Sequence, residues 1–131
     1  MRELLIDLDA VATNLKTMKA RVGQAMVMGV VKADAYGHGM IPVARKLEAA
    51  GVDYLGVADV SEALELRDAG IDLPILAWLH DPRETFVRAV AAGIELGVAN
   101  VEQLERVAKA AEHLGRVARV HLKVDTGLGR N

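Results

Sequence analysis

One lysine stands where an apolar, strand-like run gives way to a polar turn. The run AMVMGVV covers 25–31, and the turn KADAYGHG that follows it begins with Lys32 and includes Tyr36. A lysine amine that loses hydration at the edge of an apolar site becomes available as a nucleophile, which is the chemistry of Schiff-base lysines. A solvent-facing lysine at a strand end is the commoner case, so the residue types alone leave both interpretations open.

A second set of candidates lies near the end of the chain. In RVHLKVDT the alternation puts His121 and Lys123 on one face of a strand and the valines on the other. If the valine face meets helices, the polar face points toward the interior of a barrel, where charges need partners or water. Arg130, after the two glycines of DTGLGRN, could hold a carboxylate in a forked grip, although a plain connecting loop is the commoner structure. The single Trp78 is more often a core or rim residue than a cofactor contact.

Regular alternation of strand-like and helix-like segments must position these residues. Apolar runs predict strands, and amphipathic stretches between them predict helices. The expected strands lie within 25–31, 54–58, 74–79, 94–99 and 117–124, and the expected helices within 40–50, 60–69, 83–92 and 101–114. A short strand within 2–10 and a helix over 9–22 are expected to precede them.

Cap residues mark the starts of three of these helices. Asp59, Asp81 and Asn100 each stand before an amphipathic stretch with an acid or amide three positions on, and Pro82 suits a first helical turn. We therefore assign these three residues to capping rather than to chemistry. The alternation indicates an α/β architecture with a parallel sheet, either a (β/α) barrel or a doubly wound sheet. A complete (β/α)8 barrel needs eight strands and about 250 residues, so five strands cannot close one.

Composition excludes several classes of protein. The chain has 131 residues, 52% of them apolar and 26% charged, which is typical of one globular domain. A net charge of −2 predicts neither a nucleic-acid nor a membrane partner. There is no cysteine, and the four histidines show no metal-like spacing, so we expect no metal site. Neither a signal peptide nor a membrane span is expected, and we place the protein in the cytoplasm.

Three segments together resemble the alanine racemase family, whose members are fold type III pyridoxal-phosphate enzymes. VVKADAYGHG at 30–39 is similar to the family's cofactor attachment motif, and HLKVDTGLGRN at 121–131 is similar to its second signature, on the fifth barrel strand. IDLDAVATNL at 6–15 resembles its N-terminal segment. The order and spacing agree across essentially the whole chain, and two long motifs in one frame are hard to obtain by chance.

The resemblance implies a fold and an activity. The family fold is a (β/α)8 barrel of TIM type followed by a mostly β domain, working as a homodimer. Residues 1–131 would then be the N-terminal part of the barrel domain, incomplete at about five of eight strands, with the C-terminal β domain absent. The implied activity is the interconversion of L- and D-alanine on pyridoxal 5'-phosphate, which supplies D-alanine for peptidoglycan in the cell wall.

The resemblance also implies roles for five residues. Lys32 would carry the cofactor as an internal aldimine and act as one of two acid/base residues. Tyr36 would contact the cofactor near its phosphate, and Trp78 falls where an apolar side chain lies by the cofactor ring. Arg130 would help to orient the substrate carboxylate and the opposing catalytic tyrosine. Lys123 matches a lysine that some members carry as a carbamate paired with that arginine.

Two other functions stay open at this stage. The second acid/base residue of the family, a tyrosine of the partner subunit, is not contained in this sequence, so we expect little or no racemase activity from this chain alone. One alternative is a non-catalytic pyridoxal-phosphate-binding module of the same fold type. The other is a structural partial barrel completed by self-association, because open strand edges invite pairing with another chain.

Overall fold

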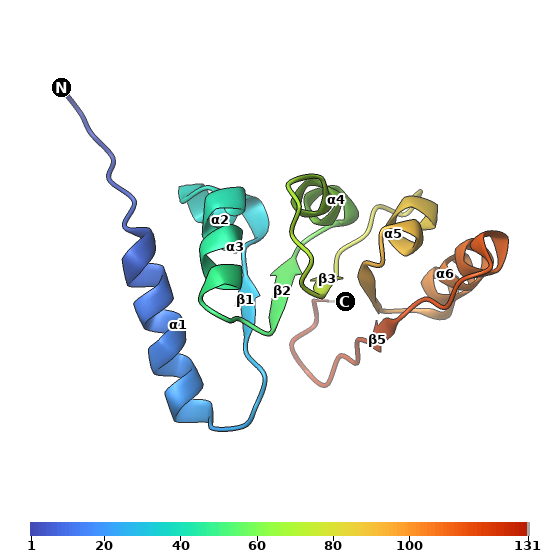
Figure 1. The fold of residues 1–131 in the computed structure, drawn as a ribbon. Coiled ribbons are helices and arrows are strands. Elements are labelled where there is room, and N and C mark those ends of the chain that lie inside the picture. Colours follow the sequence, from blue (N-terminus) through green and yellow to red (C-terminus); the bar gives the residue numbers. More distant parts are fainter. Residues whose placement is uncertain (131) are drawn as a thin grey trace.

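Five parallel strands form one sheet in which spatial order follows chain order. The structure, a computed structural model, describes residues 1–130 (Figure 1). The strands are β1 (Met28–Val30), β2 (Tyr54–Val57), β3 (Ile75–Ala77), β4 (Glu95–Val98) and β5 (Val120–Leu122), in the order β1-β2-β3-β4-β5. A doubly wound sheet reverses its strand order at a switch point, whereas consecutive order is that of a (β/α) barrel. The fold is therefore the expected parallel α/β architecture, in the form of an open, partial barrel.

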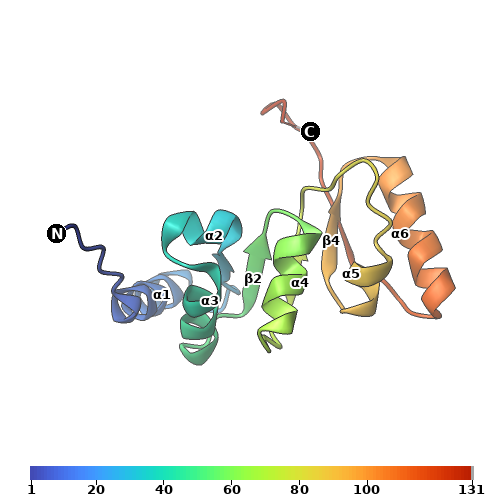
Figure 2. The same cartoon turned by 90° about the horizontal axis from the view of Figure 1, so that it is seen from above.

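Helices cover one face of the sheet, and the core lies between the two layers. The helices are α1 (Leu8–Val22), α3 (Met40–Ala49), α4 (Val60–Asp68), α5 (Val87–Ala91) and α6 (Val101–Leu114), and the short α2 (Lys32–Gly37) follows β1. Figure 2 shows α3, α4, α5 and α6 in a row on the same side of the strands. Leu55, Ile75 and Leu96 point into this layer from three strands and are fully buried. Burial of such side chains is the main favourable term in holding the helices to the sheet.

No helix within residues 1–130 covers the opposite face of the sheet, which is called the open face here (Figure 2). A Cβ added to Gly29 would meet Leu47 of α3, whereas one added to Gly56 would meet Trp78 and Met28, so these glycines mark opposite faces. Residues in register with Gly56 or two places from it share its side of the sheet. The strands contribute Met28, Val30, Tyr54, Gly56, Leu76, Glu95, Gly97 and His121 to the open face.

Two of the three expected caps are confirmed. The Asp59 carboxylate accepts from the Glu62 N–H at 3.0 Å at the start of α4, and the Asn100 side chain accepts from the Gln103 N–H at 2.8 Å at the start of α6. Asp81 does not cap a helix. It accepts from the Arg83 N–H at 2.7 Å within a turn.

The helix expected over 83–92 is shorter than its amphipathic pattern. It begins at Val87, after Phe86 in a left-handed conformation with φ 60°. Arg106 of α6 donates to the carbonyls of Pro82 and Glu84, and the Phe86 N–H donates to the Glu84 side chain at 3.1 Å instead of to a helical carbonyl. The fully buried Phe86 side chain packs edge-on against His80 at 4.9 Å between ring centroids, and this packing favours the turn over another helical turn.

The short strand expected within 2–10 is wrong. Residues before Leu8 belong to no helix or strand, and Leu4 and Leu5 are exposed. An alternating pattern becomes a strand only when a neighbour satisfies its backbone groups, and none of the described strands pairs with this segment. The helix expected over 9–22 is confirmed as α1, capped by Asp7 and packed beside α3.

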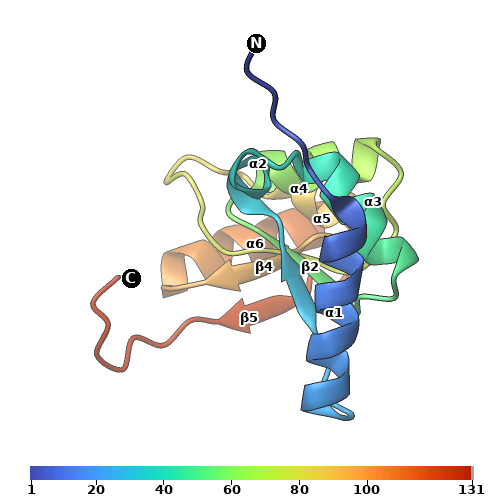
Figure 3. The ribbon, with the colours of Figure 1, turned by 90° about the vertical axis from the view of Figure 1, so that its left-hand side faces the viewer.

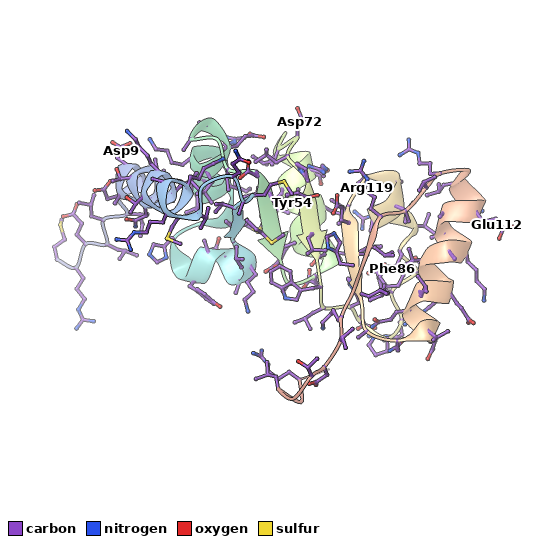
Figure 4. All side chains as sticks on the ribbon, turned by 90° about the horizontal axis from the view of Figure 1, so that it is seen from below. Asp9, Tyr54, Asp72, Phe86, Glu112 and Arg119 are labelled. Atoms are coloured by element: carbon purple, nitrogen blue, oxygen red, sulfur yellow. The ribbon has the colours of Figure 1, made fainter. Side chains whose placement is uncertain are left out.

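A buried carboxylate joins three strands across the open face. The Glu95 side chain is 6% exposed, and its Oε2 lies 2.6 Å from Nε2 of His121. The Tyr54 hydroxyl donates to Oε1 at 3.2 Å, and Arg119 approaches Oε1 at 3.5 Å (Figure 4, where Tyr54 and Arg119 are labelled). Burial raises the pKa of Glu95, but the hydrogen bonds from His121, Tyr54 and Arg119 outweigh burial and hold the pKa below its ordinary value. Glu95 is thus a charged tie between β2, β4 and β5.

Acid should weaken the fold through Glu95. Because its folded-state pKa is lowered, Glu95 contributes stability at pH values above the ordinary carboxyl value of 4.5, and this contribution is lost as the pH falls below it. We expect Glu95→Gln to flatten the decline in the free energy of unfolding between pH 5 and pH 3, as measured by urea denaturation. Glu105→Gln, on the exposed side of α6, is the control and should keep the wild-type slope. Parallel profiles for wild type and Glu95→Gln would contradict the assignment.

Candidate functional site

Lys32 opens a left-handed helical turn at the carboxyl end of β1. Ala33, Asp34, Ala35 and Tyr36 have φ between 50° and 54° and ψ between 37° and 49°. For residues other than glycine this conformation costs about 1–2 kcal/mol each, and it normally occurs singly. Four in succession are a strained backbone at the position where the sequence suggested chemistry. The sequence predicted a turn here but not its hand.

Hydrogen bonds from outside the turn hold it in place. The Asp34 carboxylate accepts from the Met40 N–H at 2.7 Å and so ties the turn to the start of α3. At the other end, the Ala33 N–H donates to the Glu62 carboxylate at 2.6 Å. Within the turn, the Ala35 N–H donates to the Val31 carbonyl at 2.9 Å.

The turn brings Lys32 and Tyr36 together. They stand four residues apart on one helical turn, and the Lys32 Nζ lies 5.7 Å from the centre of the Tyr36 ring. Lys32 is half-buried, whereas Tyr36 is 73% exposed. Within residues 1–130, the Lys32 Nζ makes no hydrogen bond and no ion pair, so no carboxylate neutralises it. A primary amine without an acidic partner fits the attachment of an aldehyde cofactor.

A second pair of the expected residues meets over the centre of the sheet. Trp78 follows β3, and its side chain lies across the open face above Gly56 and Gly97, where an added Cβ would come within 2.7 Å and 3.0 Å of it. Lys123 follows β5 and donates from Nζ to the Trp78 carbonyl at 3.4 Å. The glycines therefore leave the room that Trp78 occupies, and Trp78 offers a flat apolar surface beside the strand ends.

Arg130 lies apart from both pairs. It belongs to the segment after β5 that extends away from the sheet on the side opposite the helices (Figures 2 and 3). With Val124, Asp125, Thr126 and Leu128 it lines a hollow of about 260 Å³. Within the described part of the chain no hydrogen bond or ion pair joins it to Lys32 or Lys123. Asn131, the last residue of this motif, lies outside the described residues.

The structure thus brings four of the five expected residues to one edge of the sheet, in two separate pairs. Lys32 with Tyr36 and Trp78 with Lys123 both follow the carboxyl ends of strands, where parallel α/β folds bind ligands. The Lys32 amine offers a nucleophile, and the Trp78 side chain offers a surface for a ring contact. Both features fit pyridoxal phosphate.

Sequence reasoning missed the positions of Glu62 and His80. The capping pattern predicts only a local role for Glu62, three positions after Asp59, yet the Glu62 carboxylate also bonds to the turn that begins at Lys32. The sequence assigns no role to His80, one of the four histidines without metal-like spacing, but its Nε2 lies 2.8 Å from the Gly97 carbonyl. Burial lowers the pKa of His80 and favours the neutral ring, which suits this packed position. Neither contact has a signal in the local sequence.

Residues 1–130 contain no group of three or more His, Cys, Asp or Glu side chains arranged to hold a metal ion. In the same part of the chain, no helix is both long enough and apolar enough to cross a membrane.

Comparison with known proteins gives consistent matches. The family model described as "Alanine racemase, N-terminal domain" matches residues 6–131. The alanine racemase of Thermobifida fusca is 53% identical over 128 residues, which are 98% of this chain and 34% of that protein. An alanine racemase of Mycolicibacterium smegmatis is also 53% identical, over 98% of this chain and 33% of its own length.

Solved structures agree with the sequence matches. The alanine racemase from D-cycloserine-producing Streptomyces lavendulae superposes with a TM-score of 0.93 at 47% identity, over 96% of this chain and 33% of that one. The Bacillus anthracis alanine racemase with bound L-Ala-P has a TM-score of 0.85 at 34% identity, over 96% and 33% of the two chains. The chain spans about a third of the length of these relatives. A family model that matches almost all of the chain, together with these identities, shows that the chain belongs to the alanine racemase family.

Proposed function

We propose that this chain supplies the lysine half of an alanine racemase site, in which L- and D-alanine are interconverted on pyridoxal 5'-phosphate held by Lys32. The observation that carries the proposal is the position of Lys32. It is an amine with no hydrogen bond or ion pair among residues 1–130, placed after β1 in a member of the alanine racemase family. When bound, the cofactor acidifies the Cα proton of the amino acid by accepting electrons from that carbon.

The residues of this chain would divide the work of binding and proton transfer. Lys32 Nζ would hold the cofactor and, once released from it, take or return the Cα proton on one face of the substrate. Tyr36, four residues on, would contact the cofactor near its phosphate. Trp78 would lie against the cofactor ring, as a flat side chain supported by Gly56 and Gly97. Arg130 would orient the substrate carboxylate through its forked donors.

Racemisation also needs an acid on the opposite face of the substrate. We place that group, a tyrosine in this family, outside these residues, because Tyr36 already lies beside Lys32 and Tyr54 is tied to Glu95. We therefore expect no racemisation by residues 1–131 alone, measured as loss of optical rotation or by a D-alanine-specific assay. The second candidate is a non-catalytic binding module. A cofactor adduct at Lys32 without racemisation by the whole protein would favour it.

The proposal extends to the domain organisation and assembly of the whole protein. We place residues 1–131 in a barrel domain completed by further residues and followed by a β domain, in a cytoplasmic homodimer that supplies D-alanine for peptidoglycan. Family membership and the open, partial barrel support this arrangement.

The role of Lys32 predicts one preferred site of cofactor attachment. Incubation with limiting pyridoxal phosphate, followed by borohydride reduction and peptide mass spectrometry, should label Lys32 several-fold more than any other lysine. Lys32→Ala should remove this label and the visible absorption of the adduct, because no other lysine lies in the turn after β1 beside Tyr36, and Lys123 at the same edge donates to the Trp78 carbonyl. Lys16→Ala, on an exposed position of α1, is the matched control and should behave as wild type. Equal labelling of Lys16 and Lys32 would refute the assignment.

The proposed role of Lys123 predicts a reversible modification. Its Nζ would add to carbon dioxide, forming an N–C bond and releasing a proton, and the resulting carbamate would pair with Arg130. Protein equilibrated with ¹³C-bicarbonate should show a carbamate signal by NMR that disappears in Lys123→Ala and persists in Lys109→Ala, an exposed lysine of α6. A signal that survives Lys123→Ala, or none in wild type, would count against carbamylation.

A further inference from the structure

We propose that Glu62 is a positioning residue for Lys32. Glu62 lies in the first turn of α4, and its carboxylate binds the left-handed turn that begins at Lys32. The functional part of this inference rests on the role proposed for Lys32 above. The structural part, that Glu62 fixes the turn, can be measured without any cofactor.

The Glu62 carboxylate accepts two backbone hydrogen bonds from different loops. Its Oε2 accepts from the Ala58 N–H at 2.8 Å, at the end of β2 and immediately before the cap residue Asp59. Its Oε1 accepts from the Ala33 N–H at 2.6 Å, across 29 positions of sequence. Hydrogen bonds to an ionised carboxylate are shorter and stronger than those between neutral groups. One side chain therefore fastens the loop after β1 to the loop after β2.

Helix α6 shows how many acceptor oxygens the side chain three positions after the cap residue needs for its local hydrogen bond. Gln103 occupies the same place after Asn100 that Glu62 occupies after Asp59, and both side chains are half-buried. The Gln103 Oε1 accepts from the Ala99 N–H at 2.8 Å, the equivalent of the Ala58 bond. A carboxamide has one acceptor oxygen, and one is enough for this local role. The second oxygen of Glu62 is thus not needed to start α4, and it is the one that reaches Ala33.

The bond to Ala33 falls where the backbone strain begins. Ala33 follows Lys32 and is the first of the four left-handed residues, with φ 53°. Asp34 ties the same turn to α3 through the Met40 N–H, so Glu62 and Asp34 together anchor it to two helices. Without the Glu62 bond the strained residues gain freedom to relax toward ordinary backbone conformations. Lys32 and Tyr36 would then leave the shared face on which Nζ lies 5.7 Å from the ring centre.

Glu62→Gln separates the two bonds. A glutamine can keep the Ala58 bond, as Gln103 keeps its equivalent, but its NH2 group cannot accept from the Ala33 N–H. We expect NMR hydrogen exchange in Glu62→Gln to show the Ala33 amide losing protection several-fold while the Ala58 amide and the melting temperature change little. Nuclear Overhauser contacts between the Lys32 side chain and the Tyr36 ring should weaken in the same variant.

Gln103→Ala is the matched control. It removes the local bond to Ala99 in α6 and has no link to the turn, so it should expose the Ala99 amide and leave Ala33 and the Lys32–Tyr36 contacts as in wild type. In the labelling assay described above, Glu62→Gln should slow attachment at Lys32 several-fold, whereas Gln103→Ala should not.

The outcomes separate this inference from the proposed function. An Ala33 amide that is unprotected in wild type, or equally protected in Glu62→Gln, overturns the positioning role. Loss of Ala33 protection with unchanged labelling of Lys32 overturns it too, since the turn would then not matter for the amine. A third outcome is that wild type takes no label at Lys32, while Glu62→Gln still lowers the protection of the Ala33 amide and weakens the Lys32–Tyr36 contacts. In that case Glu62 positions the turn, and the cofactor role of Lys32 is wrong.

Discussion

The parallel alignment of the five strands is the constraint on which the rest of the structure depends. In a parallel sheet every strand ends at the same edge, and every connection must return over a face to begin the next strand. The returning helices α3, α4, α5 and α6 all lie on one face, and the residues after β1, β3 and β5 reach one edge together. Lys32, Trp78 and Lys123 lie along one edge of the sheet for this reason, although more than 40 positions separate each from the next.

Covering only one face gives the two sides of each strand different chemistry. The helix side buries Leu55, Ile75 and Leu96 completely, and these side chains need only be apolar and of fitting size. The open face instead holds a large ring over two glycines and a charged carboxylate among hydrogen-bond donors. Parallel strands in complete α/β folds are covered on both sides, so an open face of this kind matches the wall of a partial barrel.

The strained turn after Lys32 depends on this framework. A left-handed run without glycine does not persist on local preference, because each residue in it is disfavoured. Here the Ala33 N–H donates to the Glu62 carboxylate of α4, and the turn's own Asp34 carboxylate accepts from the Met40 N–H at the start of α3. Both helices are held by the buried core. The free energy that strains the backbone at Lys32 thus comes from packing elsewhere in the fold.

The sequence by itself determined those features whose physics is local. Hydrophobic periodicity predicted all five strands of the sheet and α1, α3, α4 and α6, because each element repeats its own buried face. The Asp59 and Asn100 caps were predictable since a cap residue bonds to an amide three positions away. Lys32 stood out because its residue type conflicts with the run before it, and two long motifs carried the family.

Only the tertiary structure decided the features that depend on distant partners. The segment within 2–10 has a strand-like pattern but no neighbour to pair with, and the helix over 83–92 lost its first turn to Arg106 and Phe86. The second hydrogen bond of Glu62 joins loops that are 29 positions apart. The left-handed conformation of the turn after Lys32 also depends on contacts with distant residues. The capping pattern in the sequence is the same whether its carboxylate accepts one hydrogen bond or two, because the second donor comes from another part of the chain.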